Sequence, residues 1–143
     1  MEVNSEIIQR QITFLGLKVV KTYFLNDKPF RHNLPEDLSF GLGYIIHFFS
    51  DNPRSFIVEF RLKFESKEKD FILEVIADAS FETQKPIDEK FKNSEFVKIN
   101  APAISFPFVR TFISNFTLNS GIPPLILPSI NFTKLSPKQV VTH

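Results

Sequence analysis

Apolar residues recur at every second position in the middle of the chain, and this alternation constrains the fold most. Residues 55–65, SFIVEFRLKFE, carry an aromatic or aliphatic side chain at each even position from Phe56 to Phe64. Residues 71–82, FILEVIADASFE, repeat the pattern at odd positions. Because successive side chains of a strand point to opposite faces, the pattern predicts two strands that each bury one face. One buried and one wet face are typical of an antiparallel sheet.

Two earlier segments have the same character. Residues 12–26, ITFLGLKVVKTYFLN, are rich in β-branched and aromatic residues and predict the first strand. Three of its apolar side chains alternate along the sequence, as in a strand: Leu15, Leu17 and Val19. Residues 38–49, LSFGLGYIIHFF, predict the second strand. The charged segment 27–37 between these two strands is too long for a tight hairpin.

The composition changes sharply near residue 99. Residues 83–98 are charged and predict irregular structure, whereas residues 99–132 contain one charged side chain, that of Arg110. Apolar residues spaced by four predict a helix over 104–119, with Pro107 in its first turn. A lone charge in an apolar segment needs a partner, so we expect Arg110 to form an ion pair or hydrogen bond at an interface.

The rest of the chain completes the predicted fold. Residues 121–132 form an apolar, proline-rich loop after the helix, and residues 133–143 form a short polar tail. Strands followed by a helix predict an α+β fold, with a four-stranded antiparallel sheet over about residues 12–82. One long helix and a short C-terminal segment follow, and the helix packs on one face of the sheet. We expect residues 1–143 to form a single domain.

Composition limits the possible functions. A net charge of +1 over 143 residues offers no general attraction for nucleic acid. The absence of cysteine excludes disulfides, zinc-thiolate sites and a cysteine nucleophile. No stretch of about 18 apolar residues predicts a membrane span, and residues 1–11 lack the apolar core of a secretory signal. The 18 phenylalanines exceed what a small domain readily buries, so we expect some to face a partner or a ligand.

Signals for catalysis are weak. The three histidines, His32, His47 and His143, do not lie at metal-ligand spacing, so no metal site is predicted. Three carboxylates on outward strand faces are expected to be solvated: Glu59, Glu74 and Asp78. The four glycines are scattered and form no phosphate-binding loop. We therefore expect neither an enzyme nor a cofactor.

An ordered set of motifs runs through the apolar segment: NAPAISFPFVR at 100–110, ISNFTL at 113–118, Gly121, Pro123-Pro124-Leu125, and PSINF at 128–132. This set resembles the signature of the SecB export-chaperone family. Residues 29–36 resemble the family's loop between strands one and two, and residues 71–75 resemble its fourth strand. The resemblance therefore extends over about residues 12–135.

The resemblance implies an ATP-independent chaperone, or holdase, of the bacterial cytosol that keeps polypeptides unfolded. Family members are homotetramers, built as dimers of dimers, that deliver preproteins to the SecA motor for export. Neither a cofactor nor an integral membrane segment is implied. Client contacts are expected from one set of apolar residues: Phe30, Leu34, Leu42, Tyr44, Phe108, Phe112, Ile122, Leu125 and Ile126. The family's patch for SecA corresponds to Ile72 and Glu74.

Two features differ from the export members, which are acidic and carry a longer C-terminal region. This chain is nearly neutral, with Lys18, Lys21 and Lys63 at outward or edge positions, and its tail is SPKQVVTH. A role in guarding the antitoxin of a toxin–antitoxin system therefore stays open. A different class also stays open, a small α+β carrier with an apolar ligand between sheet and helix, because the same phenylalanine excess supports it.

Overall fold

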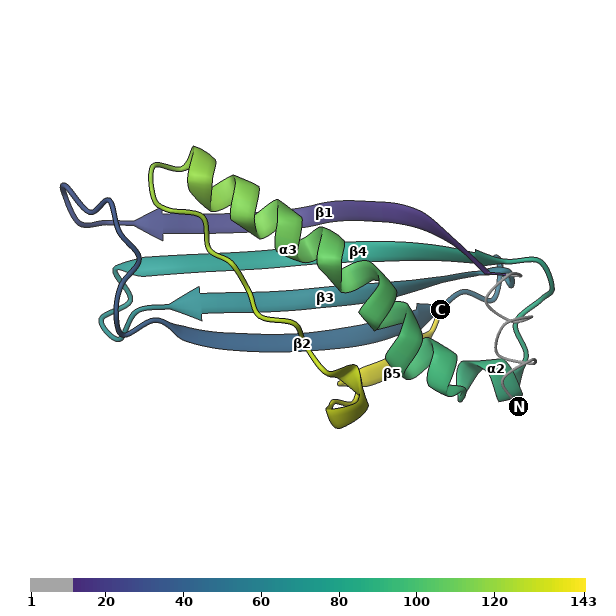
Figure 1. Ribbon diagram of the computed structural model, residues 1–143. Helices are drawn as coiled ribbons and strands as arrows, with labels where there is room; N and C mark the ends of the chain where they lie inside the picture. The colour runs from purple at the N-terminus through teal and green to yellow at the C-terminus, as the bar shows by residue number, and fades with distance from the viewer. Residues whose placement is uncertain (1–11) are drawn as a thin grey trace.

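Four long strands form the centre of the structure, a computed structural model that describes residues 12–143 (Figure 1). Their bounds are β1 (Ile12–Asn26), β2 (Ser39–Phe48), β3 (Ser55–Glu65) and β4 (Phe71–Thr83). They lie in the order β1, β4, β3, β2, and each is antiparallel to its neighbour. The predicted α+β class and the four predicted strands are confirmed. The prediction about a secretory signal in residues 1–11 lies outside the described residues.

A fifth strand, β5 (Gln139–Thr142), makes the sheet mixed, because it pairs with β2 in parallel. The amide of Lys138 donates to the carbonyl of Tyr44 at 2.8 Å, and the amide of His143 donates to the carbonyl of Phe48 at 2.9 Å. The polar composition of residues 133–143 does not predict a strand. The backbone groups along the edge of β2 supply the partners that order this segment.

β1 departs from regular pairing with β4 at two points, between Phe14 and Gly16 and between Val19 and Lys21. Gly16 has a φ of 131°, a conformation that residues with a side chain rarely adopt. At the first irregularity Leu15 is 57% exposed. Leu17 and Val19 pack against the core but Leu15 does not, because the bulge beside Gly16 breaks the regular alternation of the strand.

The helical part of the chain begins earlier than the apolar spacing predicts. A short helix, α2 (Glu89–Lys92), and a π-helical turn, η1 (Phe96–Asn100), precede α3 (Ala101–Asn119). The prediction of irregular structure over 83–98 is therefore wrong for part of that segment, because charged surface residues suit short helices as well as loops. None of the helices in residues 12–143 combines the length and the apolar character needed to cross a membrane.

Two prolines shape the first half of α3. Pro102 occupies the first turn, where a missing amide costs no hydrogen bond. Pro107 lies further inside the helix, so the prediction that it belongs to the first turn is wrong. Residue 107 cannot donate to the carbonyl of Ala103, and this turn of the helix therefore lacks one hydrogen bond.

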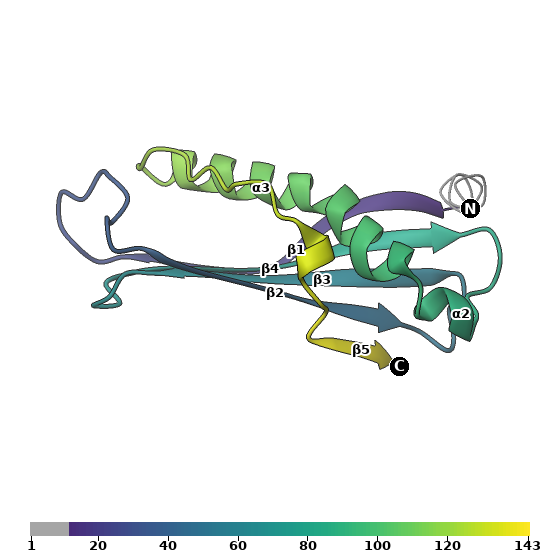
Figure 2. The same cartoon turned by 60° about the horizontal axis from the view of Figure 1, so that its bottom comes forward.

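α3 lies diagonally across one face of the sheet (Figure 1 and Figure 2). Its buried residues recur every three or four positions and include Phe106 and Ile113. The ring of Phe106 lies 5.7 Å from that of Phe60 on β3, measured between centroids. Near the other end of the helix, Phe116 meets Phe24 of β1 edge-on at 5.5 Å. Aromatic contacts therefore join the helix to the sheet near both of its ends.

Residues 120–131, called here the return segment, run back along α3 over the same face of the sheet (Figure 1). The amide of Leu125 donates to the buried hydroxyl of Thr117 at 2.8 Å. The Nε of Arg110 donates to the carbonyl of Leu127 at 3.0 Å. Arg110 therefore finds the hydrogen bond expected of it, within the chain and from a backbone carbonyl.

Candidate functional site

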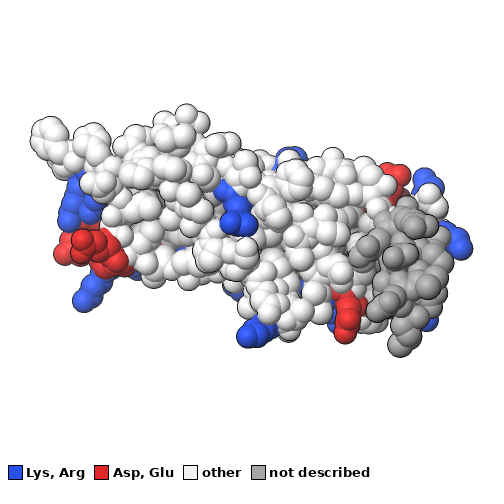
Figure 3. Space-filling view, in the orientation of Figure 1, with Lys and Arg blue, Asp and Glu red and all other residues white. Residues whose placement is uncertain are grey.

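α3 is apolar on the side that faces the solvent as well as on the side that faces the sheet. Ile104, Phe108 and Leu118 of this helix are each at least 42% exposed. The return segment adds Ile126, which is 73% exposed. We call these four residues, together with Phe30 of the loop between β1 and β2, the apolar band. Figure 3 shows that the helix-bearing face has few charged side chains between its two ends.

A groove of about 640 Å³ lies beside α3. Three aromatic side chains of the helix, Phe108, Phe112 and Phe116, line it together with Leu17 of β1. Four polar residues of the same helix region complete the lining: Thr111, Asn115, Asn119 and Ser120. Phenylalanine offers a large apolar area and demands no hydrogen-bond partner. The groove therefore suits an apolar segment of another chain.

The structure places the nine predicted client-contact residues at three levels of exposure. Three are exposed on the apolar band: Phe30, Phe108 and Ile126. Four are partly buried: Leu34, Leu42, Phe112 and Leu125. Two are buried: Tyr44 and Ile122. In this conformation, seven of the nine residues are open to a direct contact.

The two buried residues support the surface from beneath. The Tyr44 hydroxyl donates to the carbonyl of Lys98 at 3.0 Å, and its ring packs edge-on against Phe132 at 5.5 Å. Ile122 is buried just after the end of α3. The sequence pattern of the second strand does not show that later segments of the chain cover Tyr44. Tyr44 and Ile122 are therefore core residues here and offer a client no exposed surface.

The predicted residues come from several elements and do not converge on one pocket. Phe108 and Phe112 share the groove beside α3. The others come from the β1–β2 loop, from β2 and from the return segment. Sequence reasoning missed Leu17, Ile104 and Phe116 as surface residues. Their spacing correctly marks apolar faces, but spacing alone does not tell which face another element covers.

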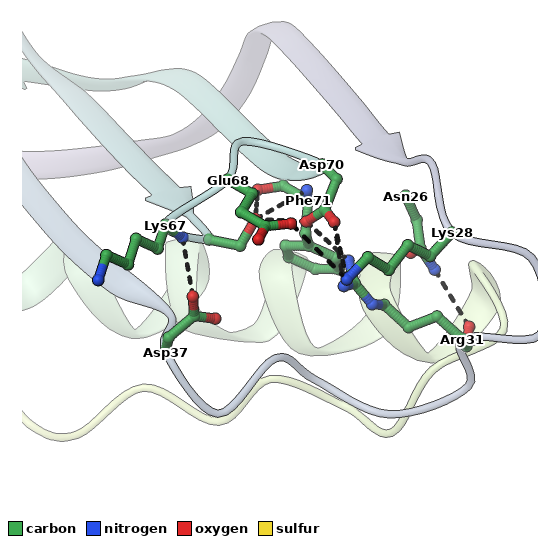
Figure 4. Close-up of polar contacts among 9 residues, drawn as sticks. Asn26, Lys28, Arg31, Asp37, Lys67, Glu68, Asp70 and Phe71 are labelled. Carbon is green, nitrogen blue, oxygen red and sulfur yellow. Dashed lines mark hydrogen bonds and ion pairs between the residues drawn. The ribbon is translucent and has the colours of Figure 1, made fainter.

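Asp70, at the turn between β3 and β4, holds the β1–β2 loop in place (Figure 4). Its carboxylate accepts a hydrogen bond from the hydroxyl of Ser66 at 2.7 Å. It also accepts from Arg31 at 3.3 Å and pairs with the ammonium group of Lys28 at 3.2 Å. The Ser66 hydrogen bond, followed by the contacts with Lys28 and Arg31, holds the pKa of Asp70 well below its usual range.

The lowered pKa of Asp70 predicts a specific loss of stability in acid. The carboxylate stabilises the folded chain fully above its unfolded pKa of about 3.9, and this contribution is lost as the pH falls toward the lower folded pKa. We expect the difference in unfolding free energy between wild type and Asp70→Asn to be constant above about pH 5 and to shrink below about pH 4. Urea unfolding followed by circular dichroism at several pH values measures this difference. A difference that stays constant down to about pH 2.5 would contradict the assignment.

The predicted SecA-docking residues, Ile72 and Glu74, lie on the sheet face away from α3, and both are partly buried. The carboxylate of Glu74 pairs with the ammonium group of Lys63 at 3.6 Å. Lys63 also contacts Glu65 at 3.4 Å. Arg61, Lys63 and Lys138 line a shallow depression beside Glu74. The carboxylate of Glu74 therefore lies among basic side chains and does not form part of a purely acidic patch.

The same sheet face carries a chain of polar contacts across its strands. The Nε2 of His47 lies 3.0 Å from a carboxylate oxygen of Glu59, and its Nδ1 lies 2.8 Å from the Nε2 of His143. Burial, and then the nearby Glu59 carboxylate, raise the pKa of Asp78. The prediction of fully solvated carboxylates is therefore wrong for Asp78, because its cross-strand neighbours restrict access of water.

The family model described as preprotein translocase subunit SecB matches residues 42–142. An uncharacterized protein of Methanocaldococcus jannaschii is 36% identical over 91 residues, which are 60% of this chain and 57% of that protein. A protein-export protein SecB of a Jannaschia species is 34% identical over 90 residues, which are 58% of this chain and 52% of that protein. The aligned residues thus span about half the length of these curated relatives.

A solved structure also resembles the chain. It is a SecB-like chaperone of Mycobacterium tuberculosis in complex with a peptide from an antitoxin. The TM-score is 0.64 at 12% sequence identity, and the alignment covers 90% of this chain and 94% of that one. At this identity the likeness concerns the fold. It supports the arrangement of the sheet and the long helix.

Proposed function

This chain belongs to the SecB family, and from that premise we propose that it is an ATP-independent chaperone that holds polypeptides in an unfolded state. The observation that carries the proposal is the exposed apolar band on α3, the return segment and the β1–β2 loop. Monomeric soluble proteins rarely expose continuous apolar patches larger than a few hundred Å². Such a surface suits the apolar segments of an unfolded chain, which have no core of their own to enter.

The chemistry of the band suits a client without a fixed sequence. Its exposed side chains are aliphatic or aromatic, so each contributes apolar area without requiring a particular hydrogen-bond partner. Contacts spread along an extended surface can bind a long chain at several points, and each point raises the effective concentration of the next. Members of the family are chaperones, so the proposal includes neither catalysis nor a cofactor.

The chaperone assembles as a homotetramer, a dimer of dimers, in the cytosol. Two features support this part of the proposal. β1 is a long edge strand, and within residues 12–143 it pairs with β4 alone. The apolar groove beside α3 lies next to β1, as Leu17 in its lining indicates. A second copy that covers an open strand edge and an apolar helix face removes two sources of aggregation.

We propose that its clients are preproteins that await export through SecA; the name of one relative, protein-export protein SecB, supports a role in export. A second candidate, an antitoxin, is favoured by one observation: Lys63 pairs with Glu74 within the patch expected to dock SecA. The solved SecB-like relative was captured with an antitoxin peptide. Calorimetric titration with SecA separates the two: binding supports export, whereas client binding without SecA binding supports the antitoxin role.

Suppression of aggregation tests the chaperone activity itself. Citrate synthase is unfolded by heat in the presence of the purified chain, with and without ATP, and aggregation is followed by light scattering. We expect suppression at about one tetramer per client and no effect of ATP. Aggregation that proceeds as it does with an equal mass of an inert protein would contradict the proposal.

A further inference from the structure

Phe30 carries two features that are unfavourable for folding. It is 92% exposed, so nearly all of its apolar area stays in water. Its φ is 64°, in the left-handed region that residues with a bulky side chain rarely occupy. A residue in such a conformation persists only where its surroundings determine it, and such residues cluster at ligand-contact sites.

The loop that carries Phe30 is held by a cluster of polar contacts around Asp70, which Figure 4 shows. Lys28 and Arg31 flank Phe30 in sequence, and both side chains reach the Asp70 carboxylate, at 3.2 Å and 3.3 Å. The Arg31 and Asp70 side chains are only 15% and 18% exposed. Because the residues on both sides of Phe30 are held toward Asp70, the aromatic ring between them is left facing solvent.

Backbone contacts secure the same loop at both of its ends. The amide of Asp27 donates to the backbone carbonyl of Asp70 at 2.8 Å, and the side-chain amide of Asn26 donates to the carbonyl of Arg31 at 3.2 Å. At the far end of the loop, the carboxylate of Asp37 accepts from the amide of Lys67 at 3.0 Å. The loop is therefore fixed to the β3–β4 turn before any client arrives.

We propose that Asp70 is a positioning residue for client binding, which acts by holding the 27–37 loop so that Phe30 is presented in one orientation. This role rests on the proposed chaperone function, and it explains how the contact between Phe30 and a client is set up before binding. A side chain that is ordered in advance loses less conformational freedom on binding. Release of Lys28 and Arg31 from Asp70 leaves Phe30 chemically intact but spread over many orientations.

A double-mutant cycle tests whether Asp70 acts through Phe30. The client is fluorescently labelled, reduced and carboxymethylated α-lactalbumin, which cannot fold, and its Kd is measured by anisotropy. We expect Asp70→Asn to raise the Kd about fivefold when Phe30 is present, because preorganisation is lost. In the Phe30→Ala background we expect the same change to raise the Kd by less than about 1.5-fold, because no ring is left to position.

Two further variants show whether an effect on the Kd comes from the 27–37 loop or from the β3–β4 turn. Arg31→Gln leaves the Ser66–Asp70 hydrogen bond in place, so it weakens the hold on the loop without altering the turn. Like Asp70→Asn, Arg31→Gln is expected to raise the Kd when Phe30 is present and to change it little in the Phe30→Ala background. Asp27→Asn is the matched control for Asp70→Asn, because it makes the same charge change within the loop that Asp70 holds, and the Asp27 side chain forms no ion pair within residues 12–143. We expect the control to leave the Kd unchanged.

The outcomes distinguish this role from the proposed function. If Asp70→Asn and Arg31→Gln each raise the Kd by the same factor with and without Phe30, the positioning role is overturned and the chaperone function stands. An unchanged Kd in both variants with Phe30 present would overturn it as well. A wild-type chain that does not bind the client at all would overturn the chaperone function and this role together.

Discussion

Replacement of Phe30, Phe108 and Ile126 by serine in one chain is expected to weaken client binding by about tenfold or more, which corresponds to about 1.4 kcal/mol. All three side chains are exposed in the free chain, so the substitutions remove mainly surface apolar area; the ring of Phe108 also lies 4.9 Å from that of Phe14, measured between centroids. Each lost side chain gives up part of the area that a client would bury, at about 25 cal/mol per Å². The unfolding free energy should change little, because exposed side chains contribute little to folding.

The binding comparison needs a control that also removes exposed apolar side chains. Leu135 and Val140 are also exposed, at 40% and 47%, but they lie in the C-terminal tail. The variant with serine at both positions should bind the unfolded client as wild type does. Equal losses in the two variants would mean that client binding depends on total surface hydrophobicity and not on the apolar band.

Phe60→Ala is expected to cost about 3–5 kcal/mol of unfolding free energy, the largest effect on stability of any change discussed. Phe60 is fully buried on β3. Its ring lies 5.7 Å from that of Phe106 on α3 and 6.3 Å from that of Phe132, the residue that directly follows the return segment. Loss of this ring leaves a cavity where sheet, helix and return segment meet. Domains of this size have only about 5–15 kcal/mol of stability to lose.

Urea unfolding followed by circular dichroism measures the cost of Phe60→Ala. Phe40→Ala provides the matched control, because Phe40 stacks on Phe64 at 4.8 Å but is 41% exposed. We expect the control to cost about 1 kcal/mol or less. A cost for Phe60→Ala no greater than that of the control would show that the helix does not depend on this contact.

The central strands could be predicted almost residue by residue. β3 matches its predicted bounds of 55–65, and β4 extends the predicted 71–82 by one residue. Both strands bury one face throughout their length, so every second position has to be apolar or small. Where the backbone departs from regular pairing, as at Leu15 beside Gly16, the alternation of apolar residues no longer tells which of them share a face.

Elements that depend on tertiary contacts were harder to predict from the sequence. β5 is only four residues long and lies in a mainly polar tail, and it pairs with the edge of β2. Burial of Tyr44 depends on the later helical segments, to which its hydroxyl is bonded through the carbonyl of Lys98. The hold of Asp70 on Lys28 and Arg31 joins residues about forty positions apart. No local spacing marks such a contact before the fold is known.

The size of the purified chain, alone and with an unfolded client, tests the account most directly. Light scattering on a sizing column is run for the chain, for reduced and carboxymethylated α-lactalbumin, and for their mixture. We predict a species of four 16.6 kDa chains, about 66 kDa, that elutes together with the client and retains it without ATP. A 16.6 kDa monomer that elutes apart from the client would contradict the account.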